Sequence, residues 1–329
     1  MSKAPDLKRS LIIGCGGYLP EKVVTNHDLA KTVETSDEWI VERTGIRKRH
    51  FAAKDQATSD LAVKAALVAL QDAKIRAEDL DLIIVSTATP DRTFPATATI
   101  IQAKLGNSKA LAFDVAGVCA GFLLGLNVAD NYLKLGQAKY ALVIGAESLT
   151  SLLDMDDRRT CVLFGDGAGA VVIEAKNKDE IDNDRGILSI KMQSDGQFHH
   201  ILYSDGGPST NGKVGKLRMD GQEVYRHAVT KLTDSAKRML ASYTLTADDI
   251  DWFIPHQANI RIIESVAQKL KFPMDKIVLT VQDHANTSAA SIPLALWVAR
   301  LDGRLKPGDL ILHEAIGGGL IWGSALIRF

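Results

Sequence analysis

Cysteine and long apolar runs are both scarce in this sequence of 329 residues. Its three cysteines, Cys15, Cys119 and Cys161, show no C-x-x-C spacing, which argues against a disulfide framework and against a zinc site. No apolar run reaches the roughly 18 residues that a membrane span needs, and Met1–Tyr18 lacks the architecture of a cleavable signal peptide. We therefore expect a cytoplasmic chain with reduced cysteines and no membrane partner.

Neither sign of charge dominates, and glycine and proline are too few for a fibrous or low-complexity chain. The 39 Lys and Arg residues nearly cancel the 40 Asp and Glu residues, and the formal net charge is -1. Glycine occurs 26 times and proline 9 times, while the hydrophobic and charged fractions of 46% and 24% are those of an ordinary globular protein. These values exclude disorder, a collagen-like fibre and a general role in coating nucleic acids.

The chain contains an internal repeat. The matching segments are 77–86 with 247–256, 141–145 with 309–313, and 169–173 with 323–327. Each pair aligns a short apolar run of the kind that forms a buried strand. Because solenoid units are only about 20–50 residues long, the much wider spacing of this repeat indicates two homologous halves. We expect these halves to span residues 1–178 and 179–329, divided at a charged connector near Asn177–Asp184.

Helical patterns alternate with these strands. One face is apolar in each of three segments, Ser59–Lys74, Glu223–Ala241 and Asn259–Leu270. The alternation is typical of βαβ units, so we expect an α/β fold with buried, mostly parallel strands. Gly14-Cys15-Gly16-Gly17 does not continue as a dinucleotide-binding loop, because the third glycine of that motif would fall at Leu19. We interpret the segment as a glycine-rich turn that leaves the first strand.

Cys119 is the candidate nucleophile. It lies among alanines and glycines at the expected start of an apolar helix, where free N–H groups and the helix dipole favour a thiolate. Small neighbours would also let a substrate reach the sulfur and let backbone N–H groups approach an oxyanion. Cys15 and Cys161 have no such setting, and we interpret them as core residues.

His256 and Asn286 are the candidate polar partners of Cys119. His256 ends a buried strand, and strand ends of α/β sheets are where polar side chains converge on ligands. Through the repeat, His256 corresponds to Ser86, and Cys119 and Asn286 follow these two positions by 33 and 30 residues. We therefore expect one half to supply Cys119 and the other to supply His256 and Asn286 to one site.

The segments around these three residues are recognisable. Residues 114–122, 255–259 and 286–293 resemble the Cys-His-Asn site of the 3-oxoacyl-[acyl-carrier-protein] synthase III family, and supporting matches lie at 37–40, 43–46, 164–169 and 317–325. The resemblance covers essentially the whole chain. It implies a thiolase-like αβαβα layered fold made of two duplicated halves, and a homodimer.

The resemblance also implies an activity, that of the initiating condensing enzyme of type II fatty acid synthesis. Cys119 would take a short acyl group from acetyl-CoA or another acyl-CoA, with the backbone N–H groups of Cys119 and Gly318 binding the oxyanion. Malonyl-acyl-carrier protein would then lose CO2, and His256 and Asn286 would stabilise the enolate. We expect no metal or redox cofactor in this chemistry.

Further roles follow residue by residue from the same resemblance. The adenine of CoA would lie between Trp39 and Arg158, an aromatic face opposite a guanidinium. The other expected CoA contacts are Thr44, Gly221 and Asn259. Phe94 would close the acyl pocket across the dimer. The acyl carrier protein would dock on Gln257, Ala258, Asn259, Ile260, Arg261 and Lys269.

Two departures from the family pattern and three alternatives remain at this stage. One departure is Gly117-Val118 before Cys119, where the family often has Ala-Ala. The segment Met219–Tyr225 differs from the typical family pattern in residues expected near the pantetheine. A starter-unit condensing enzyme or acyltransferase of secondary metabolism would share the fold and use another acyl-CoA. A Cys-His-Asn amidohydrolase or thioesterase is disfavoured because residues 114–122 do not resemble the cysteine signatures of hydrolases. A catalytically silent binding module is disfavoured because all three reactive residues are present.

Overall fold

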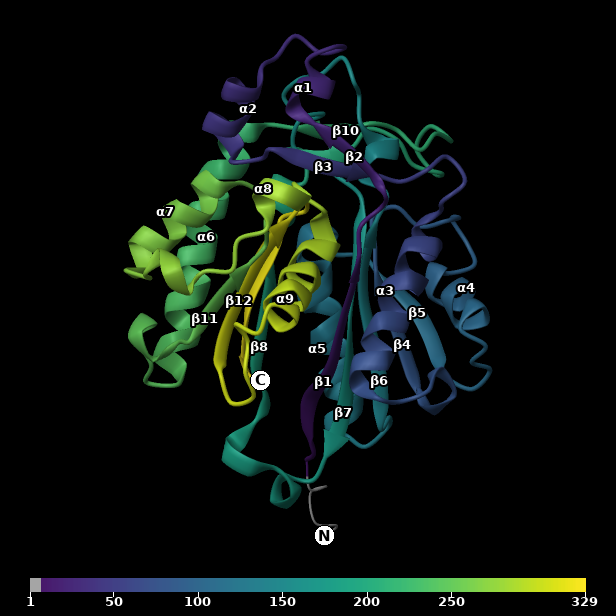
Figure 1. Cartoon of the computed structure of the whole chain (residues 1–329), viewed down its shortest axis with the longest axis vertical. Helices are drawn as coiled ribbons and strands as arrows, with labels where there is room; N and C mark the ends of the chain where they lie inside the picture. Colours follow the sequence, from purple (N-terminus) through teal and green to yellow (C-terminus); the bar gives the residue numbers. More distant parts are fainter. Residues whose placement is uncertain (1–6) are drawn as a thin grey trace.

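Two β-sheets alternate with three layers of helices in the computed structural model, which describes residues 7–329 (Figure 1). The first sheet has the order β1 (Arg9–Tyr18), β7 (Gly167–Lys176), β6 (Tyr140–Glu147), β4 (Leu82–Ser86), β5 (Leu111–Val115). The second sheet has the order β11 (Trp252–Pro255), β12 (Leu310–Gly317), β13 (Ile321–Arg328), β8 (Gly186–Ser194).

The two sheets repeat one pattern of strand directions. In the first sheet β7 runs antiparallel to β1 and β6, and β6 runs parallel to β4. In the second sheet β13 runs antiparallel to β8 and β12, and β12 runs parallel to β11. This agreement supports the duplication, although the boundary at 178/179 stays a prediction.

The expectation of mostly parallel strands is wrong. The two main sheets contain three parallel pairs and four antiparallel pairs. The reason is that β6 is followed by β7, and β12 by β13, with no α-helix between them. A direct return makes neighbouring strands antiparallel, whereas a parallel pair needs a crossover of a dozen or more residues.

Helices cover both faces of each sheet, as Figure 1 shows. The central layer holds α5 (Gly121–Lys134) and α9 (Ser291–Leu301), and the outer layers hold α3 (Thr58–Ala73) with α4 (Thr97–Lys104) and α6 (Gly221–Ser242) with α7 (Ile260–Leu270). A separate buried apolar cluster fills each of the three helical layers. The predicted αβαβα fold is therefore confirmed, and α3, α6 and α7 lie where the apolar periodicity places them.

A group of short elements lies at one end of the layers, at the top of Figure 1. These elements are β2 (Lys22–Thr25), α1 (Asn26–Leu29), α2 (Asp37–Thr44), β3 (Lys48–Phe51), β9 (Leu202–Ser204), β10 (Leu217–Met219) and α8 (Val281–His284). β2 pairs with β3 and β9 pairs with β10 in two-stranded sheets. We call this group the cap.

The glycine-rich segment at 14–17 lies inside β1 and is not a turn. A Cβ atom on Gly14 would lie 2.4 Å from the carbonyl oxygen of Ala69, and one on Gly16 would lie 2.3 Å from that of Ala65. Both carbonyls belong to α3, so the missing side chains let the helix backbone pack directly on the strand.

Candidate active site

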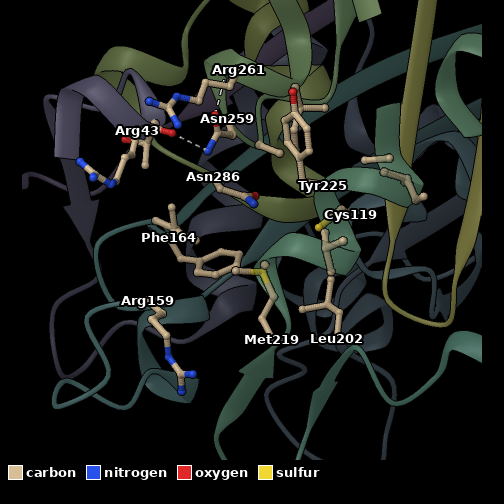
Figure 2. Close-up of a pocket in the computed structure, with 18 of the residues that line it drawn as sticks. Arg43, Cys119, Arg159, Phe164, Leu202, Met219, Tyr225, Asn259, Arg261 and Asn286 are labelled. Carbon is tan, nitrogen blue, oxygen red and sulfur yellow. Dashed lines mark hydrogen bonds between the residues drawn. The ribbon is translucent and has the colours of Figure 1, made fainter. Parts of the chain in front are cut away.

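One cavity of about 710 Å³ contains the three residues predicted to react, Cys119, His256 and Asn286. Cys119 lies in the short 3-10 helix Val118–Ala120 that precedes α5, and His256 directly follows β11. Asn286 lies between α8 and the 3-10 helix Ser288–Ala290. Figure 2 shows Cys119 and Asn286 among the side chains that line this cavity. The two sheets thus supply reactive groups to one space.

Cys119 is held in a tight backbone arrangement. The preceding residue, Val118, has a φ of 46°, a conformation that β-branched residues seldom adopt. A Cβ on Gly317 would lie 2.8 Å from the backbone nitrogen of Cys119, so only glycine fits there. Burial raises the pKa of the Cys119 thiol to about 12, and the charge of Glu147 contributes to the rise. Burial therefore opposes the thiolate that the start of the helix favours.

His256 is buried and oriented by Ser291. The Nδ1 atom of His256 lies 2.6 Å from the Ser291 Oγ, which also accepts a hydrogen bond from the Gln257 backbone N–H at 3.3 Å. Among residues 7–329 the Ser291 hydroxyl has no acceptor other than Nδ1, so it donates to Nδ1, and the imidazole proton belongs on Nε2. Burial lowers the pKa of His256 to about 3, so the ring is neutral and Nε2–H is a donor.

Asn286 is oriented in a similar way. Its Oδ1 accepts a hydrogen bond from the Ser288 backbone N–H at 2.8 Å, which leaves the amide nitrogen as the donor end. Its backbone N–H donates to the Leu163 carbonyl at 2.9 Å, and its carbonyl accepts from the Gly165 N–H at 3.1 Å. The loop at 163–165 thus positions Asn286 from the other half of the chain.

Gly318 is not among the residues that line the cavity. A Cβ on Gly318 would meet the carbonyl oxygen of Leu202 at 2.6 Å, while the neighbouring Gly317 packs against the Cys119 backbone. Gly317 is therefore adjacent to the nucleophile. The oxyanion role of the Cys119 and Gly318 N–H groups stays a prediction.

Trp39, Thr44, Gly221 and Asn259 all line the same cavity as Cys119. The hydroxyl of Thr44 is already used, because it donates to the Ile40 carbonyl and accepts from the Ile46 N–H. Thr44 therefore has no hydroxyl proton left to donate to a ligand.

Arg158 is not among these lining residues. Its guanidinium carbon lies 5.5 Å from the Trp39 ring centroid, and Nη1 donates to the Glu34 carbonyl. A purine between Trp39 and Arg158 would need two contacts of roughly 3.5–4.0 Å each, so Arg158 has to swing away before one can enter.

Two arginines at the cavity were missed in the sequence. Arg43 and Arg159 both line it, and Figure 2 shows their side chains. The guanidinium carbon of Arg43 lies 4.7 Å from the Trp39 ring centroid. The i,i+4 spacing of Trp39 and Arg43 in a helix could have revealed this pair, whereas the loop at Arg159 carries no such signal.

The segment predicted to dock a carrier protein divides into exposed and buried parts. Ala258, Asn259 and Arg261 line the cavity, and Lys269 is exposed on the last turn of α7. Ile260 packs against Gly45, where an added Cβ would lie 2.7 Å away.

The docking prediction is wrong for Gln257. It is fully buried, and its side chain bonds only to backbone groups of Pro255, Val278, Thr280 and Val281. No side-chain atom of Gln257 remains for a partner, since every polar group is used to hold the strand end in place.

Phe94 lies outside the cavity and is 83% exposed. Apolar side chains of Phe164, Leu202 and Met219 line the same cavity as Cys119, and Figure 2 shows them. Among residues 7–329, no three His, Cys, Asp or Glu side chains converge in a way that could hold a metal ion. Over the same range, every helix is too short or too polar to cross a membrane.

Comparisons with known proteins place this geometry in a family. The family model for 3-oxoacyl-[acyl-carrier-protein (ACP)] synthase III matches residues 113–196, and the model for its C-terminal part matches residues 240–329. A beta-ketoacyl-[acyl-carrier-protein] synthase III of Paramagnetospirillum magneticum is 59% identical over 97% of this chain and 99% of that protein. The chain belongs to the 3-oxoacyl-[acyl-carrier-protein] synthase III family.

Solved structures of the synthase III family have the same fold. The 3-oxoacyl-[acyl-carrier-protein] synthase III from Aquifex aeolicus is 44% identical with a TM-score of 0.92, covering 97% of this chain and all of that chain. The priming beta-ketosynthase of the R1128 polyketide pathway is 32% identical with a TM-score of 0.91, covering 99% of this chain and 98% of that chain. Structures similar to this chain thus include an enzyme of a polyketide pathway.

Proposed function

We propose that this chain is the initiating condensing enzyme of fatty acid synthesis, an acyltransferase that joins a short acyl group to malonyl-acyl-carrier protein. The observation that carries the proposal is the single cavity that contains a buried cysteine together with two oriented neutral donors, His256 and Asn286. A cysteine with two such donors suits a reaction that first forms an acyl-enzyme on the sulfur and then an enolate that the donors stabilise.

In the first half-reaction, Cys119 attacks the thioester carbonyl of acyl-CoA and CoA leaves. The N–H groups of Cys119 and Gly318 are the proposed oxyanion donors. The aromatic face of Trp39 and the cationic Arg43 and Arg159 suit the nucleotide end of CoA at the cavity mouth.

In the second half-reaction, malonyl-acyl-carrier protein loses CO2 and the resulting carbanion attacks the acyl-Cys119. The His256 Nε2–H and the Asn286 amide are the donors proposed for the enolate oxygen. Both are fixed before substrate arrives, so little reorganisation is needed when charge develops there. This chemistry calls for no metal or redox cofactor.

A short acyl group suits the space beside Cys119. Phe164, Leu202 and Met219 limit this space within the chain. Phe94, which is 83% exposed, is available to reach the pocket of a second copy of the chain. We infer that acetyl-CoA is the preferred donor.

A homodimer is supported by the edge of the first sheet. β5 pairs only with β4, and its Leu111 is 51% exposed. An unpaired edge strand is a template for pairing with a second copy about a twofold axis. Leu111→Lys should convert a dimer into monomers in sedimentation-velocity experiments, and a monomeric native protein would contradict the proposal.

The proposed docking surface for the acyl carrier protein consists of Ala258, Asn259, Ile260, Arg261 and Lys269. Arg261 is half exposed and stays tethered to α2 through a hydrogen bond from Nε to the Glu42 carbonyl. An acidic partner would meet this local positive charge even though the whole chain is nearly neutral. A location in the cytoplasm stays a prediction.

Intact-protein mass spectrometry tests the proposed function directly. The protein is incubated with a mixture of acyl-CoAs, and digestion then locates the added mass. We expect an acetyl group on Cys119 and none on a Cys119→Ser variant. Acylation of that variant at the native rate would refute the assignment.

The main alternative is a priming enzyme of a secondary pathway. The R1128 priming beta-ketosynthase is 32% identical to this chain, against 59% for the synthase III of Paramagnetospirillum magneticum, so this alternative is not favoured. Selective loading of a longer or branched acyl group from the same mixture would support this alternative over fatty acid synthesis.

A further inference from the structure

A buried carboxylate lies behind the nucleophile and has no part in the mechanism above. Glu147, the last residue of β6, is fully inaccessible to solvent. Its Oε2 accepts hydrogen bonds from the Thr89 hydroxyl at 2.8 Å, the Ala88 N–H at 3.1 Å and the Thr87 hydroxyl at 3.3 Å. Its Oε1 accepts from the Ser288 hydroxyl at 3.1 Å. Within residues 7–329 it forms no ion pair, so its charge is held by neutral donors.

Ser288 connects this carboxylate to the reactive groups. Its hydroxyl bonds to Glu147, and its 3-10 helix, Ser288–Ala290, packs against the 3-10 helix Val118–Ala120 that holds Cys119. Its backbone N–H separately holds the Asn286 side chain. Ser288 is 1% exposed and has a φ of 49°, an unfavourable conformation for a non-glycine residue. The surrounding structure therefore keeps this hydroxyl on Glu147, beside the 3-10 helix that holds Cys119.

The site needs a proton acceptor that His256 does not provide. Cys119 is a thiol at neutral pH because burial raises its pKa to about 12. His256 carries its proton on Nε2 because Ser291 donates to Nδ1. The ring nitrogen that remains free, Nε2, is therefore a hydrogen-bond donor and not a proton acceptor. Acyl transfer requires the thiol proton to go elsewhere.

We propose that Glu147 accepts the Cys119 proton through Ser288 during acyl loading. This inference rests on the proposed function. The S–H bond of Cys119 breaks and its proton passes to the Ser288 oxygen, while the Ser288 hydroxyl proton passes to Oε1 of Glu147. The sulfur then bonds to the acyl carbon, and the bond from that carbon to the CoA sulfur breaks.

The proton returns in the second half-reaction. Attack by the carbanion expels Cys119 as a thiolate, and Glu147 returns its proton through Ser288 to that sulfur. The CoA thiolate released in the first step takes a proton from water according to its own pKa. Glu147 is thus ionised again at the end of each cycle.

The groups around Glu147 make its role measurable through pH. Thr87, Ala88 and Thr89 face it from the segment after β4, and Ser288 faces it from the segment after α8. The titratable group on the neighbouring 3-10 helix is Cys119, and the charge of Glu147 acts on its thiol. Burial raises the pKa of Glu147 to about 7, so the loading rate should rise with pH through that value.

Rapid-quench mass spectrometry of Cys119 acetylation by acetyl-CoA tests the proposal. Glu147→Gln keeps the size of the side chain and cannot accept a proton, so loading at pH 7 should slow by about a hundredfold. Ser288→Ala should slow loading to a similar extent, and the double variant should be no slower than either single one. Equal loading by native protein and Glu147→Gln, or additive losses in the double variant, would overturn the proposal.

Two controls separate a proton acceptor from a structural support. Malonyl decarboxylation is compared between Cys119→Ala and Cys119→Ala/Glu147→Gln; equal rates are expected, and a loss in the double variant would assign Glu147 a structural role instead. Asp130→Asn changes another buried acid, one that pairs with Lys134 on α5, and should load normally. Failure of the native protein to load would refute the proposed function itself, which keeps the two failures distinct.

Discussion

At the residue scale, the site depends on which end of each side chain is already occupied. Ser291 takes Nδ1 of His256 and the Ser288 N–H takes Oδ1 of Asn286, so both side chains present a donor to the cavity. Burial keeps His256 neutral by lowering its pKa to about 3. The pair is therefore suited to an oxyanion and unsuited to act as a base.

Asn286→Ala removes one of the two donors proposed for the enolate. We expect malonyl decarboxylation to fall by about 10²–10³-fold, the usual loss for one oxyanion donor. Acetylation of Cys119 should continue at close to the native rate, because the loading step uses other donors. Release of labelled CO2 and the mass of the acyl-enzyme measure the two half-reactions. A parallel loss of both would contradict the separation of roles.

At the element scale, two glycines of β1 that have no side chain let the backbone of α3 pack closely on the first sheet. Glycines at 14 and 16 face the backbone of α3 at distances that no Cβ could occupy. The sequence pattern showed the glycines but not their neighbours, and a turn was the nearer interpretation. The feature that distinguishes a strand from a turn at this segment is the packing of α3 on the glycines. That helix lies more than 40 residues further along the chain, so the local sequence does not reveal it.

Gly16→Ala tests this close packing. The new methyl group would lie 2.3 Å from both the Ala65 carbonyl oxygen and the Ala69 nitrogen, so strand and helix must separate. We expect a loss of stability of about 1–3 kcal/mol or more, measured by urea unfolding. Gly196→Ala is the matched control, because nothing lies within 4 Å of its added Cβ, and it should change stability little. Equal stability of the two variants would contradict the packing argument.

At the scale of the whole molecule, buried ionisable groups make stability depend on pH in both directions. Burial lowers the pKa of His256 to about 3 and contributes to lowering those of His284 and His313 to about 4. Their neutral forms stabilise the fold fully above their ordinary pKa of 6.5, and this stabilisation is lost as pH falls toward the lowered values. Burial raises the pKa of Glu147 to about 7 and that of Glu314 to about 8, so their stabilisation is lost as pH rises from 4.5 through those values.

We therefore predict maximal thermal stability near pH 6.5. Differential scanning calorimetry should show a lower melting temperature at pH 5 and at pH 8, with each kcal/mol lost lowering it by roughly 2–4 °C. Glu314→Gln should reduce the decline on the alkaline side, because both oxygens of this buried carboxylate lack a hydrogen-bond partner within residues 7–329. A melting temperature that stays constant from pH 6.5 to 8 would contradict the prediction.

Much of the architecture and the meeting of Cys119, His256 and Asn286 could be predicted because they depend on periodicity and on spacing within a repeated unit. Strand direction could not, since it depends on whether a helix lies between consecutive strands. The inward turn of Gln257 and the contact of Arg158 with Glu34 depend on local backbone geometry just after a strand and within a loop. The network of Glu147 and Ser288 joins residues 141 positions apart, and no local pattern reveals it.

The isolated bridge between Phe164 and Asn286 joins the two halves of the chain within the cavity itself. Phe164 is proposed to limit the space for the acyl group, and Asn286 is proposed to act on the malonyl group. A substitution that moves the 163–165 loop would therefore alter substrate size preference and decarboxylation together. If both proposed roles hold, primer selectivity and condensation rate are coupled at this position.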